Sequence, residues 1–227
     1  MHIDAKAGKR VSLARTCTAL KKLWRHKRIA MATYTKDDAV GFAAYFVRAR
    51  TKTQQRRFIA HASWLWVRLQ QRRGVCGGAV MLDIDDTLID GHERVDHGFE
   101  AMCDFVDVVS LAFPLHLVTA RPKDQHDKVL ALMRNRGVCV PPDRLHMLPT
   151  NLYDGPIRHV EEFKWETSKN ISRQHSGVLV RIGDRLWDVA HLRTLDEGTF
   201  EHVQEKDSYI FRDPALRGTL SAKLTGS

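Results

Sequence analysis

Beyond Gly77 the sequence alternates short apolar segments with longer segments of helical pattern, and three of the apolar segments run directly into polar clusters. The apolar segments are residues 79–82, 114–119, 144–148 and 177–182, with 208–211 as a fifth candidate. The helical segments between them are residues 98–109, 123–136 and 164–174. Strands that alternate with helices form βαβ units, so the pattern predicts an α/β fold with a mainly parallel sheet. In such sheets ligands bind beyond the carboxyl ends of the strands, which is where the polar clusters fall.

Two of these clusters are acidic, and each follows a buried strand of the predicted sheet. Asp83 and Asp85 follow residues 79–82, and side chains two apart in an extended segment point the same way, so their carboxylates are expected to converge. Asp184 and Asp188 follow residues 177–182, and they share a face if this segment begins a helix. Clustered carboxylates repel one another unless a cation joins them. Oxygen ligands without a neighbouring Cys or His favour Mg²⁺, so the sequence predicts a magnesium site at this edge.

Four motifs, in this order along the chain, resemble those of the haloacid dehalogenase (HAD) superfamily of phosphatases. They are Asp83-x-Asp85-x-Thr87 after the first strand, Thr119 at the end of the second, Lys164 at the start of a later helix, and Gly183-Asp184-x-x-x-Asp188 after the fourth. The resemblance covers about residues 77–195 and is nearest to the acid-phosphatase-like branches of the superfamily. It implies a Rossmann-like three-layer α/β/α fold and a Mg²⁺-dependent phosphatase that acts on phosphomonoesters.

The resemblance also implies a role for each acid. Asp83 would attack phosphorus and form an aspartyl-phosphate. Asp85 would give Mg²⁺ its backbone carbonyl, and its side chain would protonate the leaving group and then deprotonate the attacking water. Asp184 would be the main remaining carboxylate on the metal, and Asp188 would act directly or through water.

The basic and hydroxyl side chains of the motifs would bind the substrate. Thr119 and Lys164 would hold the transferring phosphoryl group, whose charge spreads over its oxygens. Lys169 is the alternative lysine, but Lys164 is preferred because a helix start after a loop lies nearer the strand ends. Arg121 is a candidate for clamping a substrate phosphate, as is Arg185, and for both the alternative is an ion pair with the acids of the site.

Charge divides the chain into two unequal parts. The first 73 residues carry 18 Lys and Arg against 3 Asp and Glu, whereas residues 74–227 carry 18 against 24. We therefore expect a basic, flexible arm over residues 1–34, a helical segment over 35–74 that packs on the core, and a catalytic domain over 75–227. Within the helical segment, one helix is predicted to start near Thr35 and a second to cover residues 54–70. The apolar face predicted for this second helix consists of Phe58, Ala62, Leu65 and Leu69, beside Ile59 and Trp66.

The intervals between the motifs are too short to hold a separate cap domain, and an open site admits large substrates. The basic N-terminal region then makes nucleic-acid ends an alternative to small phosphate esters, through phosphate contacts and counterion release. A further alternative is a non-catalytic nucleic-acid-binding protein with a relic site. The chain shows no membrane-spanning apolar run, no signal peptide and no C-x-x-C pair among its four cysteines. A cytoplasmic or nuclear protein with reduced thiols is therefore expected.

Overall fold

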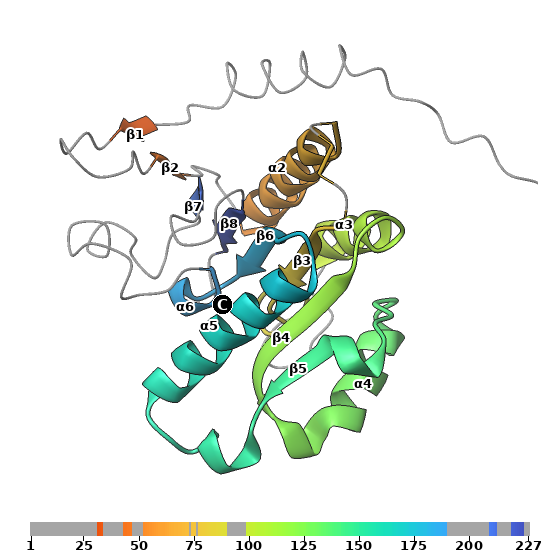
Figure 1. Ribbon diagram of the computed structural model, residues 1–227, viewed down its shortest axis with the longest axis vertical. Coiled ribbons are helices and arrows are strands. Elements are labelled where there is room, and N and C mark those ends of the chain that lie inside the picture. The colour runs from red at the N-terminus through yellow and green to blue at the C-terminus, as the bar shows by residue number, and fades with distance from the viewer. Residues whose placement is uncertain are drawn as a thin grey trace, which may run out of the picture.

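A computed structural model of the chain describes residues 31–33, 43–46, 52–72, 74–75, 77–89, 99–189, 209–212 and 219–224. Eight strands in these residues form one sheet, in the order β1-β2-β7-β8-β6-β3-β4-β5 (Figure 1). Five neighbouring strands are parallel: β8 (Leu220–Lys223), β6 (Val178–Gly183), β3 (Ala79–Leu82), β4 (Leu115–Pro122) and β5 (Leu145–Leu148). The other three are antiparallel: β7 (Tyr209–Arg212), β2 (Ala43–Phe46) and β1 (Met31–Thr33). The prediction of an α/β fold with a mainly parallel sheet is confirmed.

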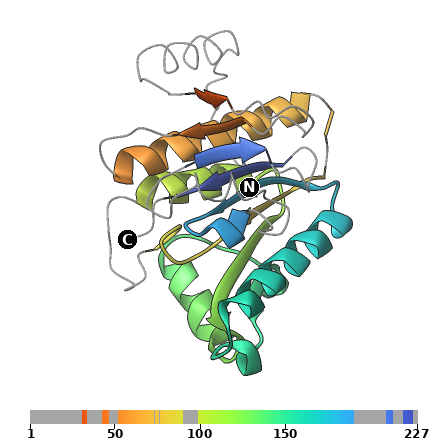
Figure 2. The ribbon, with the colours of Figure 1, turned by 90° about the vertical axis from the view of Figure 1, so that its left-hand side faces the viewer.

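Helices cover both faces of the sheet. On one face α2 (Lys52–Arg72), α3 (Glu100–Ser110) and α4 (His126–Asn135) contribute to one apolar core. On the other face α5 (Ile157–Gln174) packs against β3, β4 and β6, and the short α6 (Leu186–Val189) follows β6. Figure 2 shows α4 and α5 on opposite sides of the sheet. The 3₁₀ turns η2 (Lys123–Gln125), η3 (Pro142–Arg144) and η4 (Thr150–Leu152) connect elements in the part of the chain between β4 and α5.

The central strands are apolar on both faces because helices cover both. In β3, Val80 and Leu82 enter the core beneath α2 and α3, while Ala79 and Met81 pack towards Ile171 of α5. A strand enclosed in this way shows a continuous apolar run rather than alternation, which is why β3 is visible in the sequence. Its polar successor, Asp83, therefore leaves the sheet at the carboxyl edge, where the strand ends.

The N-terminal region differs from its prediction. The prediction of a helix that starts near Thr35 is wrong for residues 43–46. These residues form strand β2, which pairs with β1 and β7. Residues 31–33, assigned to a flexible arm, form β1, and residues 1–30 lie outside the described residues. Helical spacing of apolar residues over so few positions does not exclude a strand, and pairing with β7 settles the conformation.

The second N-terminal helix is confirmed as α2, and of its predicted apolar face the side chains of Phe58 and Leu69 lie outside the described residues. The apolar side chains of α2 that the structure shows fully buried are Ile59, Ala60 and Val67, whereas Ala62 and Leu65 are only partly buried. Ser63 and Gln70 are buried too, so the face holds polar residues that a search for apolar spacing passes over. The boundary proposed at residue 74 stays a prediction.

Two further differences concern the catalytic part of the chain. Helix α5 begins at Ile157, after Pro156, and so starts seven residues before the position expected from the sequence. Strand β8 was not expected, because Ser221 and Lys223 interrupt its apolar pattern, yet all four of its residues are buried. Of the helices that the structure describes, none is both long enough and apolar enough to cross a membrane.

Candidate functional site

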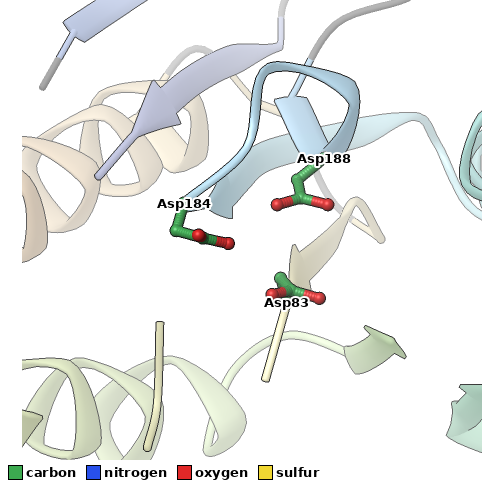
Figure 3. Close-up of side chains that lie close together, drawn as sticks. All are labelled: Asp83, Asp184 and Asp188. Carbon is green, nitrogen blue, oxygen red and sulfur yellow. The ribbon is translucent and has the colours of Figure 1, made fainter. Parts of the chain in front are cut away.

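Three aspartates from two neighbouring parallel strands meet at the carboxyl edge of the sheet. Asp83 follows β3, and its backbone N–H donates to the carbonyl of Ile182 in β6 at 2.8 Å, which ties the two strand ends together. Asp184 follows β6, and Asp188 lies in α6 one turn later. All three side chains are buried, and a carboxylate oxygen from each lies within 4.8 Å of the other two. Figure 3 shows the three carboxylates directed towards one another.

A buried lysine of helix α5 also belongs to this cluster. Lys164 lies two turns into α5 and is 2% exposed. Its ammonium donates to Oδ1 of Asp83 at 2.7 Å and to Oδ1 of Asp188. Lys169, the alternative lysine, pairs instead with Glu166 on the partly exposed side of the same helix. The structure thus places Lys164 at the acids, although not at the helix start on which the preference for it rested.

A glycine permits the close approach of Asp188. A Cβ added at Gly183 would overlap the Cβ and carboxyl group of Asp188, so only glycine fits there without a shift. Oδ2 of Asp188 accepts a hydrogen bond from the backbone N–H of Arg185 at 2.9 Å, which closes the turn into α6. The carbonyl of Gly183 accepts from the N–H of Leu224, just after β8, at 2.7 Å. The Gly-Asp-x-x-x-Asp spacing therefore has a geometric reason in this fold.

Burial acts on the pKa values of the groups in this cluster in the direction that favours their neutral forms. Burial raises the pKa of the Asp83 carboxyl well above its usual range, against the lowering effect of Lys164. Burial and then the charge of Asp188 raise the pKa of Asp184 to about 7. Burial alone would lower the pKa of Lys164, but Asp188 and Asp83 outweigh it and raise that pKa above its usual value. With all four groups ionised, three carboxylates face one ammonium, so the cluster favours a bound cation or proton.

Asp85 does not join the cluster, and the expected convergence of its carboxylate with that of Asp83 is wrong. The chain is not extended here: the N–H groups of Thr87, Leu88 and Ile89 all donate to the carbonyl of Ile84, so it turns directly after Asp83. The rule that side chains two apart share a direction holds only for extended backbone. The backbone carbonyl of Asp85, which the resemblance assigns to the metal, is unaffected by this correction.

Arg121 holds the Asp85 carboxylate instead. Its guanidinium donates to both oxygens of Asp85, at 2.8 Å from Nη2 and 3.1 Å from Nε. Its backbone N–H donates to the hydroxyl oxygen of Thr119 at 3.1 Å, and Thr119 is fully buried at the end of the apolar part of β4. Arg185 likewise lies on an acid, with Nε 3.2 Å from Oδ2 of Asp184. Both arginines thus take the ion-pair alternative in this structure, and a substrate role for Arg121 stays a prediction.

One residue at the site was missed by sequence reasoning. Arg56 of α2 is 2% exposed, and its Nη2 lies 3.5 Å from the carbonyl oxygen of Asp86, in the turn that follows Asp83. The signal available was its helical spacing from Ile59, Ser63 and Val67, which places it on the buried face of α2. A charged residue at such a position is easily taken for a solvated one.

Sequence comparison matches this chain to no family model and to no curated protein. Among solved structures, the fold is similar to that of the class C acid phosphatase from Bacillus anthracis, with a TM-score of 0.48 and 14% sequence identity. The similarity covers 62% of this chain and 66% of that phosphatase, which is slightly less than two thirds of its length. Function therefore has to be inferred from the residues of the site itself.

Proposed function

We propose that this protein is a Mg²⁺-dependent phosphatase of the HAD type, which hydrolyses phosphomonoesters through an aspartyl-phosphate at Asp83. One observation carries the proposal: three buried carboxylates and one buried ammonium meet at the carboxyl edge of a parallel sheet. Structural acids are seldom buried together with an excess of negative charge, whereas a site for a cation and a phosphate needs such an arrangement.

The donor set fits a hard divalent cation. Asp83 and Asp184 would hold it with one carboxylate oxygen each, Asp188 directly or through water, and Asp85 through its backbone carbonyl. Oxygen donors of this kind suit Mg²⁺, and no cysteine or histidine belongs to the cluster that the described residues form. A bound ion would offset the charge of the substrate phosphate and make its phosphorus more electrophilic.

The chain's own groups would carry the bond changes. A carboxylate oxygen of Asp83 forms a bond to phosphorus as the bond from phosphorus to the ester oxygen breaks. Lys164, hydrogen-bonded to Oδ1 of Asp83, holds this carboxylate in place. Water then attacks the same phosphorus, the acyl-phosphate bond breaks, and Asp83 is released with inorganic phosphate as the second product.

Proton transfer would fall to Asp85. Its side chain is 34% exposed, beside the cluster rather than within it, so it can reach a leaving group that the buried acids cannot. It would give a proton to the departing ester oxygen and take one from the attacking water, so the protons balance over a turnover. The Thr119 hydroxyl accepts from the Arg121 backbone, so its own hydrogen points elsewhere and would donate to a phosphoryl oxygen.

The test is hydrolysis of an aryl phosphate with Mg²⁺ by the wild type, Asp83→Asn and a control, Asp104→Asn. Asp104 is an exposed acid on α3, so its replacement should leave activity unchanged. Asp83→Asn keeps the size of the side chain but loses the nucleophile, and kcat should fall at least about a thousandfold. Unchanged hydrolysis by Asp83→Asn, or a wild type inactive with Mg²⁺ and Mn²⁺ across neutral and acid pH, would overturn the proposal.

A second substrate class, phosphorylated nucleic-acid ends, is favoured by the composition of α2. Its 21 residues include five Lys and Arg and no Asp or Glu, and Arg57 and Arg68 are exposed. Such a helix attracts a polyanion by displacing its counterions. In the same assay, kcat/KM for an end-phosphorylated oligonucleotide should exceed that for the aryl phosphate and should fall more steeply with salt. An equal salt dependence for both substrates favours small esters.

A further inference from the structure

Arg56 lies where α2 meets the turn that follows the proposed nucleophile. Its side chain is buried, and the guanidinium carbon lies 3.8 Å from the centre of the Phe99 ring. From this position Nη2 reaches the carbonyl oxygen of Asp86 at 3.5 Å, thirty residues away in sequence. A guanidinium over an aromatic face gains more when it is desolvated, so Phe99 offsets part of the cost of burying this charge. The arginine thus links an N-terminal helix to the Asp85–Asp86 turn.

The backbone at this turn needs support. Asp86 has a φ of +53°, and the structure describes no other non-glycine residue with a positive φ. This left-handed conformation costs a residue with a Cβ about 1–2 kcal/mol, so it persists only where surrounding contacts favour it. On one side Arg121 holds the Asp85 carboxylate. On the other side Arg56 holds the Asp86 carbonyl, so two arginines from different elements fix the turn.

This turn sets the direction of two groups that the proposed function uses. The Asp85 carbonyl is the proposed metal ligand, and the Asp85 carboxylate is the proposed acid and base. A carbonyl moves with the peptide plane that carries it, and the Asp86 carbonyl belongs to the next plane along. A shift of about 1 Å in such a group can lower a rate about a hundredfold, even when the mutated residue does not touch the substrate.

We propose that Arg56 is a positioning residue, which fixes the Asp85–Asp86 turn and makes α2 a part of the catalytic unit. The inference rests on the proposed phosphatase function, because it assigns Arg56 an effect on the metal ligand and on the proton donor of that reaction. An arginine that only filled the core would affect stability without affecting the site in the folded protein.

The experiment compares Arg56→Met and Arg56→Lys with Arg57→Met, which removes the same charge from the adjacent, exposed position. At a temperature where each variant is fully folded, kcat of Arg56→Met for an aryl phosphate should fall about 10- to 100-fold, with KM changed less than about threefold. Arg56→Lys should recover part of kcat because it keeps a donor and a charge, and Arg57→Met should match the wild type.

Calorimetric titration with Mg²⁺ separates this inference from the proposed function. Arg56→Met should bind Mg²⁺ several-fold more weakly than the wild type or Arg57→Met, whether or not any ester is hydrolysed. A wild type that binds Mg²⁺ but hydrolyses nothing would overturn the proposed function alone. If Arg56→Met has the same kcat and the same Mg²⁺ affinity as the wild type, and only its melting temperature is lower, the positioning role is overturned. If Arg56→Met does not fold, Arg56→Lys is compared with Arg57→Lys by the same two measurements.

Discussion

The two ends of the parallel strands each hold a cluster of polar side chains, buried at one end and partly buried at the other, and the two clusters differ in how their charges are balanced. At the carboxyl edge Asp83, Asp184 and Asp188 face one ammonium, so charges of one sign are in excess. At the amino edge three histidines meet between the sheet and α5. His116 and His146 are the second residues of β4 and β5, and His175 directly follows α5.

In the histidine cluster the rings provide hydrogen-bond partners for one another. Nδ1 of His116 lies 2.9 Å from Nε2 of His146, and its Nε2 lies 3.0 Å from Nε2 of His175. A neutral imidazole has one donor and one acceptor nitrogen, so His116 donates to one neighbour and accepts from the other. Burial, and then the charges that His146 and His175 would carry, lower the pKa of His116 to about 4. Burial also lowers the pKa of the other two rings.

This difference in charge balance distinguishes a structural cluster at the amino edge from a candidate binding site at the carboxyl edge. At the amino edge the three rings pair with one another without a net charge, and they join two strands to the end of a helix. At the carboxyl edge the protein's own groups leave negative charge uncompensated, which costs stability unless a ligand supplies the missing charge. A buried cluster that its own fold leaves unbalanced is the better candidate for function.

The largest effect should follow removal of Lys164, the buried cation that contacts both Asp83 and Asp188 at the carboxyl edge. Lys164→Met leaves the Asp83 and Asp188 carboxylates buried without their partner, and breaking a buried ion pair on one side costs about 3–5 kcal/mol. The free energy of unfolding, measured by urea denaturation near neutral pH without divalent ions, should fall by that amount. Saturating Mg²⁺ should restore part of it, because an ion that binds only the folded state stabilises that state.

The matched control for this change is Lys169→Met in the same helix. Lys169 pairs with Glu166 near the surface, and such pairs contribute less than about 1 kcal/mol. Equal losses in the two variants would show that Lys164 does not balance a charged cluster, and the contrast between the two edges would then fail.

The sequence predicts the carboxyl edge better than it predicts what surrounds it. Asp83, Thr119 and Asp184 could be placed because each follows a visible apolar run, and parallel strands bring the ends of these runs to the same edge, although β4 continues to Pro122 beyond Thr119. The same reasoning failed for the Asp85 side chain, since the direction of a side chain in a turn depends on backbone hydrogen bonds rather than on spacing.

Long-range partners account for the rest of what was missed. In the sequence Arg56 is one of several basic residues of a basic helix, and only the fold shows that it lies beside Phe99 and the Asp86 carbonyl. Ser221 and Lys223 conceal β8, because their burial comes from the neighbouring strands β6 and β7 and not from their own hydrophobicity. His116 contacts His146 and His175, which lie 30 and 59 residues further along the chain, so no local sequence pattern predicts this cluster.

Acid should weaken the amino edge by the next largest amount. The unfolded chain binds a proton at His116 near pH 6.5, whereas the folded chain binds it only near pH 4. The contribution of a neutral His116 is therefore complete above about pH 6.5 and is lost as the pH falls towards 4. Between about pH 7.5 and pH 4.5 this group should remove about 2–3 kcal/mol from the free energy of unfolding.

A pairwise comparison isolates this effect, because the raised pKa values of Asp83 and Asp184 act in the opposite direction in every variant. Urea denaturation at both pH values should show that His116→Gln loses about 2–3 kcal/mol less than the wild type, while His126→Gln, at the start of α4, behaves as the wild type. Arg144 and Asp143 also act on His116, in opposite directions. If His116→Gln loses as much free energy of unfolding between the two pH values as the wild type does, the proposal that a neutral His116 stabilises the amino edge is contradicted.

The smallest expected loss of stability follows substitution of Gly183, and it differs from a loss elsewhere because the affinity for Mg²⁺ should fall with it. A Cβ at Gly183 overlaps Asp188, so Gly183→Ala should displace this acid from Lys164 and lower the free energy of unfolding by about 1–3 kcal/mol. Gly137→Ala is the control: it lies in open space after α4, but its φ of +78° disfavours a Cβ, at a cost of about 1 kcal/mol. Both variants should be less stable in urea, yet only Gly183→Ala should also lose Mg²⁺ affinity in a calorimetric titration. If Gly183→Ala binds Mg²⁺ as the wild type does, the position of Asp188 does not matter to the cation, and the carboxyl edge would be held together by Lys164 without a role for its third acid.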